Sequence, residues 1–264
     1  MTTPVLVDYE VDGRAAQLTL NSPHNRNALS TTLVGQLHRG LRDALADPQV
    51  RVVVLRHTGG TFCAGADLSE GSGGDAGGAA ADRAREMTTL LRAIVECEKP
   101  VLAVVDGHVR AGGLGLVGAC DIVVAGPRST FALTEARIGV APTIISLTLL
   151  PKLSARAASR YYLTGETFTA GEAAEIGLIT IAADDIETAA VAIIEALGKG
   201  SPQGLAASKA LTTASILAGF DRDAERLTVD SARLFVSEEA REGMLAFLQR
   251  RPPRWAQTEG RTDV

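Results

Sequence analysis

The sequence has little of what marks secreted, membrane-spanning or nucleic-acid-binding proteins. Its three cysteines show no Cys-x-x-Cys spacing, so neither a disulfide framework nor a zinc site is expected. No apolar run approaches the about 18 residues that cross a bilayer, and the first residues lack the basic and apolar segments of a secretory signal. With a net charge of −5, general attraction to nucleic acid is not expected. We therefore expect a cytoplasmic protein with reduced thiols, and with Cys97 and Cys120 in its core.

Strands and helices alternate through the first half of the chain. Runs of β-branched residues at 50–55 and 101–105 are typical of buried strands, and each is followed by small residues and a helical pattern. This alternation predicts an α/β fold with right-handed crossovers. From about residue 154 the pattern is mostly helical, ending near Arg250 before two prolines. We expect a core over 1–200 and a helical segment over 201–264.

Shorter patterns give the other expected elements. A hairpin is predicted over 5–20 around Asp12-Gly13, and Ser30 is the expected N-cap of a helix reaching Ala46. The helix should bury one face, formed by Leu33, Leu37, Leu41 and Leu45. A further strand is expected over 121–125 and helices over 83–97 and 113–119. The glycine-rich stretch 70–81 is predicted to be a mobile surface loop without regular structure.

Two segments follow the predicted strands at 50–55 and 101–105, and each turns through small residues into a predicted helix. They are 61–68 (Thr-Phe-Cys-Ala-Gly-Ala-Asp-Leu) and 106–115 (Asp-Gly-His-Val-Arg-Ala-Gly-Gly-Leu-Gly). Two such turns can aim two backbone N–H groups at one point, as an oxyanion hole for a thioester carbonyl requires. The alternative is that the small residues only allow close packing of helix on strand.

Seven motifs in order resemble those of the enoyl-CoA hydratase/isomerase family, the crotonase superfamily. They are 27–29 (Asn-Ala-Leu), 62–68, 107–115, 119–122 (Ala-Cys-Asp-Ile), 134–139 (Thr-Glu-Ala-Arg-Ile-Gly), 163–165 (Leu-Thr-Gly) and 242–248 (Glu-Gly-Met-Leu-Ala-Phe-Leu). The resemblance covers nearly the whole chain. It implies a crotonase-like (ββα)n spiral core, with a C-terminal helical trimerisation segment that forms trimers or dimers of trimers.

The resemblance also implies the parts of a site for an acyl-CoA thioester. The backbone N–H groups of Ala66 and Gly112 would form the oxyanion hole and stabilise an enolate. Residues around coenzyme A would be Arg26 near the phosphates, Ala64, Asp67 and Leu68 near the adenine and pantetheine, and Phe247 and Arg250 from a neighbouring subunit's C-terminal helix. Arg250, Arg251 and Arg254 can alternatively be a solvated helix end.

One of the two glutamates of family hydratases is missing. Aligned on 119–122, the first glutamate position falls on Gly115 and the second on Glu135. A glycine cannot hold water or transfer a proton, whereas a single buried carboxylate suits a one-base proton shift. The alternative for Glu135 is a surface acid that complements a helix dipole, and Arg137 can pair with it or point to solvent.

Two further departures bear on the site. Arg110 and His108 stand beside the second turn, where either can hold water, contact a substrate carboxylate or cap a turn. After Gly139, the β-branched pair Ile144-Ile145 replaces the glycine-rich turn of many relatives and is expected to line or cap the acyl pocket.

The sequence thus predicts an acyl-CoA-processing enzyme that works through an enolate. The expected reaction is double-bond isomerisation or hydration of an enoyl-CoA thioester, with isomerisation ranked first and Glu135 as the retained acid/base. No metal is expected, and no cofactor beyond the coenzyme A of the substrate. The alternative is a non-catalytic acyl-CoA-binding or carrier protein on the same fold.

Overall fold

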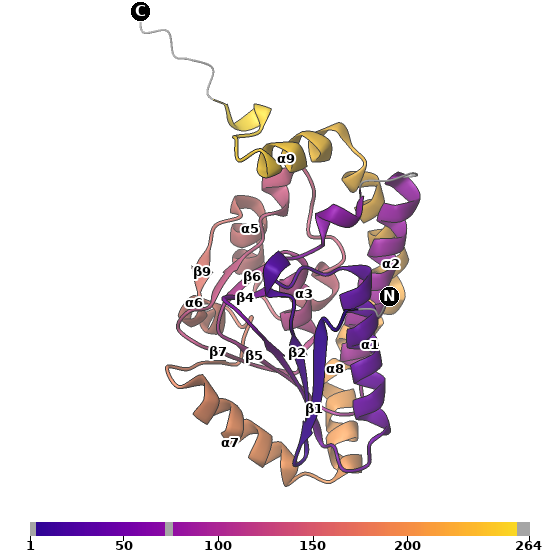
Figure 1. Cartoon of the computed structure of the whole chain (residues 1–264), viewed down its shortest axis with the longest axis vertical. Helices are drawn as coiled ribbons and strands as arrows, with labels where there is room; N and C mark the ends of the chain where they lie inside the picture. Colours follow the sequence, from indigo (N-terminus) through magenta and orange to yellow (C-terminus); the bar gives the residue numbers. More distant parts are fainter. Residues whose placement is uncertain (1–3, 72–75, 258–264) are drawn as a thin grey trace, which may run out of the picture.

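The computed structural model describes residues 4–71 and 76–257, and two β-sheets form the core of this part of the chain (Figure 1). The larger sheet runs in the order β1 (Val7–Asp12), β2 (Ala15–Leu20), β3 (Val52–His57), β5 (Val101–Val105), β7 (Ile122–Ala125) and β10 (Ile181–Ala182). The smaller sheet has the order β4 (Thr61–Cys63), β6 (His108–Arg110), β8 (Thr130–Ala132) and β9 (Phe168–Thr169). The hairpin β1–β2 is antiparallel, and strands β2, β3, β5, β7 and β10 are parallel.

A repeating strand–strand–helix unit builds the core. Strands β3, β5 and β7 of the larger sheet each lead, within a few residues, into β4, β6 and β8 of the smaller one. A helical element follows each pair: α2 (Ala76–Glu96), α3 (Gly112–Ala119) and the 3-10 turn η3 (Glu135–Ile138), the first after the short turn η2 (Leu68–Gly71). The predicted (ββα)n spiral is confirmed. Because β4, β6 and β8 are parallel neighbours, their carboxyl ends lie at one edge.

Helices cover both faces of the larger sheet. On one face Leu18 and Leu55 pack in a core shared with α1 (Thr31–Ala46), α2 and α8 (Pro202–Phe235). On the other face Val52 and Val104 pack with Ala190 of α7 (Ile186–Gly198). Figure 1 shows α7 apart from the other three helices, across the sheet. Side chains alternate along each strand, so two hydrophobic faces fit runs such as Val52 to Leu55.

The C-terminal helices pack back onto this core. Helix α8 begins after the N-cap Ser201 and lies along α2. Its Lys209 is buried, with Nζ 2.7 Å from Asp121 Oδ2 and donating to the carbonyl of Ile94. The ion pair joins α8 to the start of β7. Whether residues 201–264 serve oligomerisation stays a prediction, and 258–264 lie outside the described residues.

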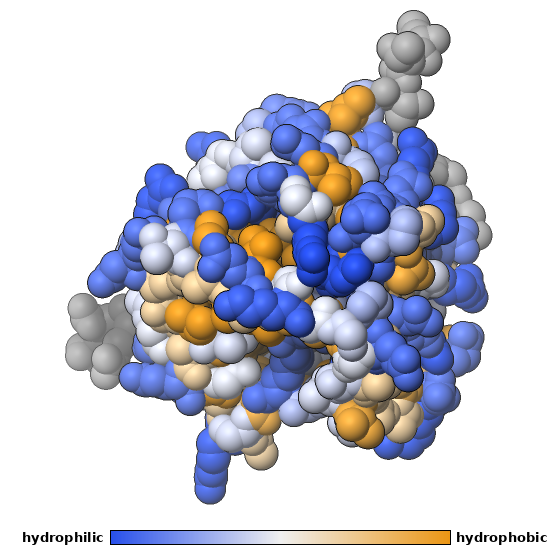
Figure 2. Space-filling view, turned by 90° about the horizontal axis from the view of Figure 1, so that it is seen from below, coloured by the Kyte–Doolittle hydropathy of each residue, from blue (hydrophilic) through white to orange (hydrophobic). Residues whose placement is uncertain are grey.

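Six helical elements remain in the described part of the chain: η1 (Pro23–Asn25), α4 (Ser146–Leu149), α5 (Ala155–Thr164), α6 (Ala170–Glu175), α9 (Glu238–Leu248) and η4 (Arg254–Ala256). The side chains of Ser154, Thr169 and Ser237 cap three of them, α5, α6 and α9. Thr169, for example, forms a capping box with Glu172 at the start of α6. Among the described helices, none is both long enough and apolar enough to span a bilayer. The face seen in Figure 2 is largely hydrophilic, with hydrophobic residues in small separate patches.

Three details differ from the sequence predictions. Residues 76–81 are helical, because α2 begins at Ala76 within the glycine-rich stretch predicted to be irregular; residues 72–75 of that stretch lie outside the described residues. Leu45 is 43% exposed, so it does not belong to the buried face of α1. The short strands of the smaller sheet went unpredicted. Cys63, Cys97 and Cys120 are all buried free thiols, as expected for the last two.

Candidate active site

The two small-residue turns predicted from the sequence lie against one another. A Cβ placed on Gly65 would lie 2.9 Å from Ala111 Cβ and 3.5 Å from Gly112 N. Gly65 also has a φ of +94°, which favours glycine. Behind the turns, a Cβ on Gly113 would lie 2.8 Å from Cys63 Cβ. The turns after β4 and β6 therefore meet only because glycine stands at these positions.

Both turns leave a backbone N–H group available. In residues 4–71 and 76–257 no acceptor is found for the amide of Ala66 or of Gly112. Gly112 is the first residue of α3, where amides have no partner within the helix. It follows Ala111, whose φ of 46° and ψ of −120° are strained for a non-glycine residue. The sharp turn at Ala111 thus brings the helix N-terminus beside the Ala66 turn.

The first motif of the chain holds the Ala66 turn in place. Leu29 forms a parallel bridge to Ala66: its N–H donates to Gly65 O at 2.8 Å, and its carbonyl accepts from Asp67 N at 3.2 Å. The fully buried Asn27 donates to the carbonyls of Thr58 and Thr61 at 3.1 and 2.8 Å. The Asn-Ala-Leu motif therefore fixes the Ala66 turn through Leu29 and the segment before it through Asn27. The sequence alone did not reveal this role.

Glu135 is a buried carboxyl group and not the surface acid that was the alternative. It is 7% exposed, and its Oε2 has no hydrogen-bond partner among the described residues. Burial raises its pKa from 4.5 to about 7, opposed in part by a hydrogen bond from its own backbone N–H. It begins η3 just after β8, whose Ala132 carbonyl accepts from Ala111 N at 3.4 Å. Glu135, whose pKa is near 7, therefore follows shortly after Ala132, the residue that contacts the second turn.

A second polar group near Glu135 went unnoticed in the sequence. Tyr162 of α5 is partly buried, and its hydroxyl lies 3.2 Å from Ser146 Oγ. Ser146 in turn donates to Pro142 O at 2.5 Å. Burial raises the pKa of Tyr162 to about 12, and the charge of Glu135 adds to the effect. No motif in the sequence marks this tyrosine, because its position beside η3 arises only from the packing of α5.

Gly115 has no room for a side chain. A Cβ there would lie 2.5 Å from Ile145 Cγ2 and 3.1 Å from Met87 Cε. Ile144 and Ile145 are both buried, at 6% and 5% exposure. The position of the missing glutamate is therefore filled by apolar atoms from other elements.

Arg110 and His108 do not turn toward this position. The Arg110 guanidinium donates to the carbonyls of Val109 and Thr130, and to Thr130 Oγ1 at 2.9 Å. His108 Nδ1 lies 2.7 Å from the same hydroxyl. Thr130 is the first residue of β8 and pairs with His108. Both side chains thus bind back along the smaller sheet, away from the turn that follows Arg110.

The residues expected around coenzyme A form two groups. Arg26 is exposed and its carbonyl accepts from Ala64 N at 3.1 Å, while Asp67 accepts from Asn25 and from Ser69. These contacts bring Arg26, Ala64 and Asp67 together beside the Ala66 turn, where Leu68 begins η2. Phe247 is 57% exposed on α9. Arg250 follows this helix with a φ of 53°, the left-handed conformation that ends many helices.

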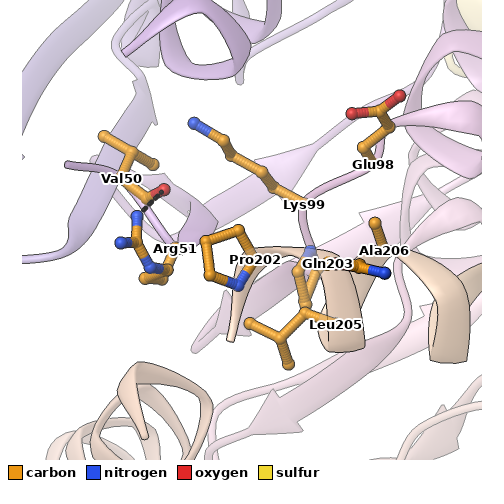
Figure 3. A pocket seen from close by; sticks show the side chains of 9 residues that line it. Val50, Arg51, Glu98, Lys99, Pro202, Gln203, Leu205 and Ala206 are labelled. Carbon is orange, nitrogen blue, oxygen red and sulfur yellow. Dashed lines mark hydrogen bonds between the residues drawn. The ribbon is translucent and has the colours of Figure 1, made fainter. Parts of the chain in front are cut away.

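Two hollows of the described surface lie elsewhere. One of about 160 Å³ lies where α8 starts, between Val50, Lys99 and Pro202 (Figure 3). There Lys99 Nζ donates to the carbonyls of Ala44 and Asp47 at the end of α1. Another of about 460 Å³ is lined by the ion pairs Arg56–Glu187 and Arg128–Asp106. The lysine and arginine side chains that line the two hollows all bind groups within the chain.

The spiral core and the paired turns define a protein of the crotonase fold. A sequence model of the enoyl-CoA hydratase/isomerase family matches residues 10–258. The solved structure of an enoyl-CoA hydratase from Mycobacterium avium superposes with a TM-score of 0.90 at 69% identity, covering 96% of this chain and all of that one. The 2,3-dehydroadipyl-CoA hydratase of Escherichia coli is 32% identical over 91% of this chain and 94% of its own. A peroxisomal Δ3,5-Δ2,4-dienoyl-CoA isomerase of Arabidopsis thaliana is 26% identical over 95% of this chain and 96% of its own. The chain belongs to the enoyl-CoA hydratase/isomerase family, and it is an acyl-CoA-processing enzyme of that family.

Proposed function

We propose that this enzyme isomerises the double bond of an enoyl-CoA thioester, with Glu135 as its one acid/base group. The observation that carries the proposal is a buried Glu135 whose Oε2 has no hydrogen-bond partner among the described residues, together with a glycine at position 115, where there is no room for a side chain. The relatives' names include both hydratases and an isomerase. They do not choose between the two reactions, so the choice rests on these two positions.

The reaction needs only a proton to move. Ionised Glu135 takes a proton from carbon 2 of a 3-enoyl-CoA, and the electron pair passes to the thioester oxygen to give a dienolate. The protonated Glu135 then returns the proton to carbon 4, and the 2-enoyl-CoA forms. A group with a pKa of about 7 is suited to both halves of this transfer at neutral pH. No electrons are gained or lost, so we propose no cofactor beyond the coenzyme A of the substrate.

In this proposal the amides of Ala66 and Gly112 bind the thioester oxygen. The support is that the two turns touch and that neither amide has an acceptor among the described residues. Negative charge develops on that oxygen in the dienolate, and removal of one such donor typically costs about 3–4 kcal/mol in activation free energy. The N-terminus of α3 adds a favourable dipole.

We extend the proposal to coenzyme A and to assembly. Arg26, Ala64, Asp67 and Leu68 would hold coenzyme A, since backbone contacts bring the first three together beside the Ala66 turn and Leu68 begins η2 just after it. Phe247 and Arg250 would reach the coenzyme A of a neighbouring subunit in a trimer or a dimer of trimers. Exposed apolar side chains at the C-terminal end support such an interface: Leu245, Phe247, Leu248 and Trp255. Free buried thiols are usual in a reducing compartment, which supports a cytoplasmic location.

The test incubates the wild type and Glu135→Gln with 3-enoyl-CoA and 2-enoyl-CoA thioesters and identifies the products by mass and chromatography. The wild type should interconvert the two regioisomers, and the variant should lose roughly 100-fold or more of that rate while still binding coenzyme A. A water adduct as the main product, lost in the variant, would instead identify a hydratase that uses one glutamate. Equal rates for both proteins would remove Glu135 from the chemistry.

A further inference from the structure

Helix α4 packs on a glycine face of α3. Gly115 and Gly118 lie three residues apart and so share one face of this helix. A Cβ on Gly118 would lie 2.9 Å from Leu149 Cδ2 and 3.0 Å from Thr148 Oγ1. Thr148 is fully buried, and its hydroxyl lies 3.2 Å from Gly115 O and 3.1 Å from Ile145 O. The hydroxyl thus bridges the backbones of the two helices, and α4 approaches α3 as closely as backbone and side chains allow.

Ile145 is the side chain that this packing brings onto Gly115. It is the N-cap residue of α4, so its position follows from the seating of that helix. Its Cγ2 would lie 2.5 Å, and its Cβ 3.1 Å, from a Cβ on Gly115. Real Cβ atoms essentially never approach another atom to within 3.0 Å, as the first of these contacts would require. Any residue other than glycine at 115 therefore requires Ile145 to move or to be smaller.

The two departures from the family pattern, the glycine at 115 and the isoleucine at 145, therefore lie in direct contact with each other. Gly115 and Ile145 are thirty residues apart in sequence, and Ile145 can lie where it does only because residue 115 is glycine. The atoms that close this position, Ile145 Cγ2 and Met87 Cε, carry no hydrogen-bond donor or acceptor. A wall of this kind can neither bind nor activate a water molecule for addition to the substrate.

We propose that Ile145 determines the reaction specificity of this enzyme, because its branched side chain occupies the place of a second carboxylate and so holds the site to one-base isomerisation. The inference rests on the proposed function, in which Glu135 is the remaining acid/base. It assigns the outcome of the reaction to a residue of α4 and not to Gly115 alone. A glutamate restored at 115 should fail unless Ile145 is also reduced.

The test compares Gly115→Glu, Gly115→Glu/Ile145→Gly and Gly115→Glu/Ile144→Gly. The last is the matched control, since Ile144 is buried to the same degree and is not among the nearest atoms to Gly115. Glycine is accepted at an N-cap position such as 145. Each protein is assayed for hydration of 2-enoyl-CoA to 3-hydroxyacyl-CoA, in which water adds OH to carbon 3 and H to carbon 2. Melting temperature and coenzyme A binding are measured beside the rates.

Only the Ile145 double variant is expected to gain hydration, by about tenfold or more over the wild type, since a positioned acid or base typically contributes roughly 100-fold or more. Gly115→Glu and the Ile144 control should melt lower and gain nothing. Equal gains in all three proteins would overturn the proposal, as would a folded, coenzyme A-binding double variant with no gain.

A second measurement separates this inference from the proposed function. Gly115→Ala and Ile145→Gly are made singly and together, and their unfolding free energies form a double-mutant cycle. If Ile145 fills this place, the alanine should destabilise the wild type more than it destabilises Ile145→Gly. Additive effects would contradict the contact, whatever reaction the enzyme catalyses. Failure of the wild type to isomerise any substrate would instead sink the proposed function and leave the cycle intact.

Discussion

Replacing Glu135 with glutamine should change how the stability of the protein depends on pH. Burial raises the pKa of Glu135 from 4.5 to about 7, and a tenfold change in proton affinity corresponds to about 1.4 kcal/mol. Ionised Glu135 therefore costs the folded state about 3 kcal/mol relative to the unfolded chain. Between these two pKa values the unfolded chain has released its proton and the folded protein has not. The wild type should thus lose stability as pH rises from about 4.5 to about 7, and no more above that.

Glutamine has a similar shape and does not ionise, so Glu135→Gln should lack this loss. Urea unfolding, followed by helical circular dichroism at fixed protein concentration, gives the free energy of unfolding at each pH. Between about pH 5 and about pH 8 the wild type should lose about 2–3 kcal/mol more than the variant. Glu225→Gln, on the exposed side of α8, is the control and should run parallel to the wild type. If the free energy of unfolding changed with pH in the same way in the wild type and in Glu135→Gln, Glu135 would not be a buried carboxyl group that keeps its proton in the folded state.

Three further predictions concern the rate and the scaffold. The isomerisation rate kcat/KM should rise with pH to a plateau with a midpoint near 7, because Glu135 must be ionised to take the proton; a flat profile from about pH 5 to 9 would contradict this role. Lys209→Met leaves the partly buried Asp121 without its ion-pair partner and should cost about 3–5 kcal/mol in urea unfolding. Arg85→Met, which breaks the exposed pair with Asp82, should cost about 1 kcal/mol or less, and similar losses for the two would argue against the buried pair. Ala111→Gly should stabilise the protein by about 1 kcal/mol because φ is 46°, and a loss of stability would show that the turn is not strained.

Sequence patterns predicted the long buried elements and missed the short ones. Strand β5 coincides with its β-branched run at 101–105. Strands β4, β6 and β8 have three residues each, too few to show a period, and they pair only with partners that are distant in sequence. The glycines of 70–81 predicted irregular structure, but residues 76–81 also contain alanines, which favour helix, and α2 continues well beyond them. Helix propensity is a weak guide when a long helix continues beyond the stretch.

The sequence pointed to individual candidate residues of the site, but not to the contacts between them. The resemblance to the family's motifs pointed to Gly115 and Glu135 as the two positions that matter, and their roles stay a prediction. The sequence could not show that Ile145 fills the space at Gly115, because the contact depends on how α4 is seated on α3. Tyr162 reaches the surroundings of Glu135 in the same way, through the packing of α5. Contacts between distant segments leave no local pattern in a single sequence.

The most direct test of the one-glutamate account follows a labelled proton. A 3-enoyl-CoA that carries deuterium at carbon 2 is converted by the wild type in a single turnover in ordinary water, and the 2-enoyl-CoA is examined for deuterium at carbon 4. One buried carboxylate that takes and returns the same proton should carry part of the label to carbon 4. Product molecules that all hold solvent hydrogen at carbon 4, or a 3-hydroxyacyl-CoA in place of the isomer, would contradict it.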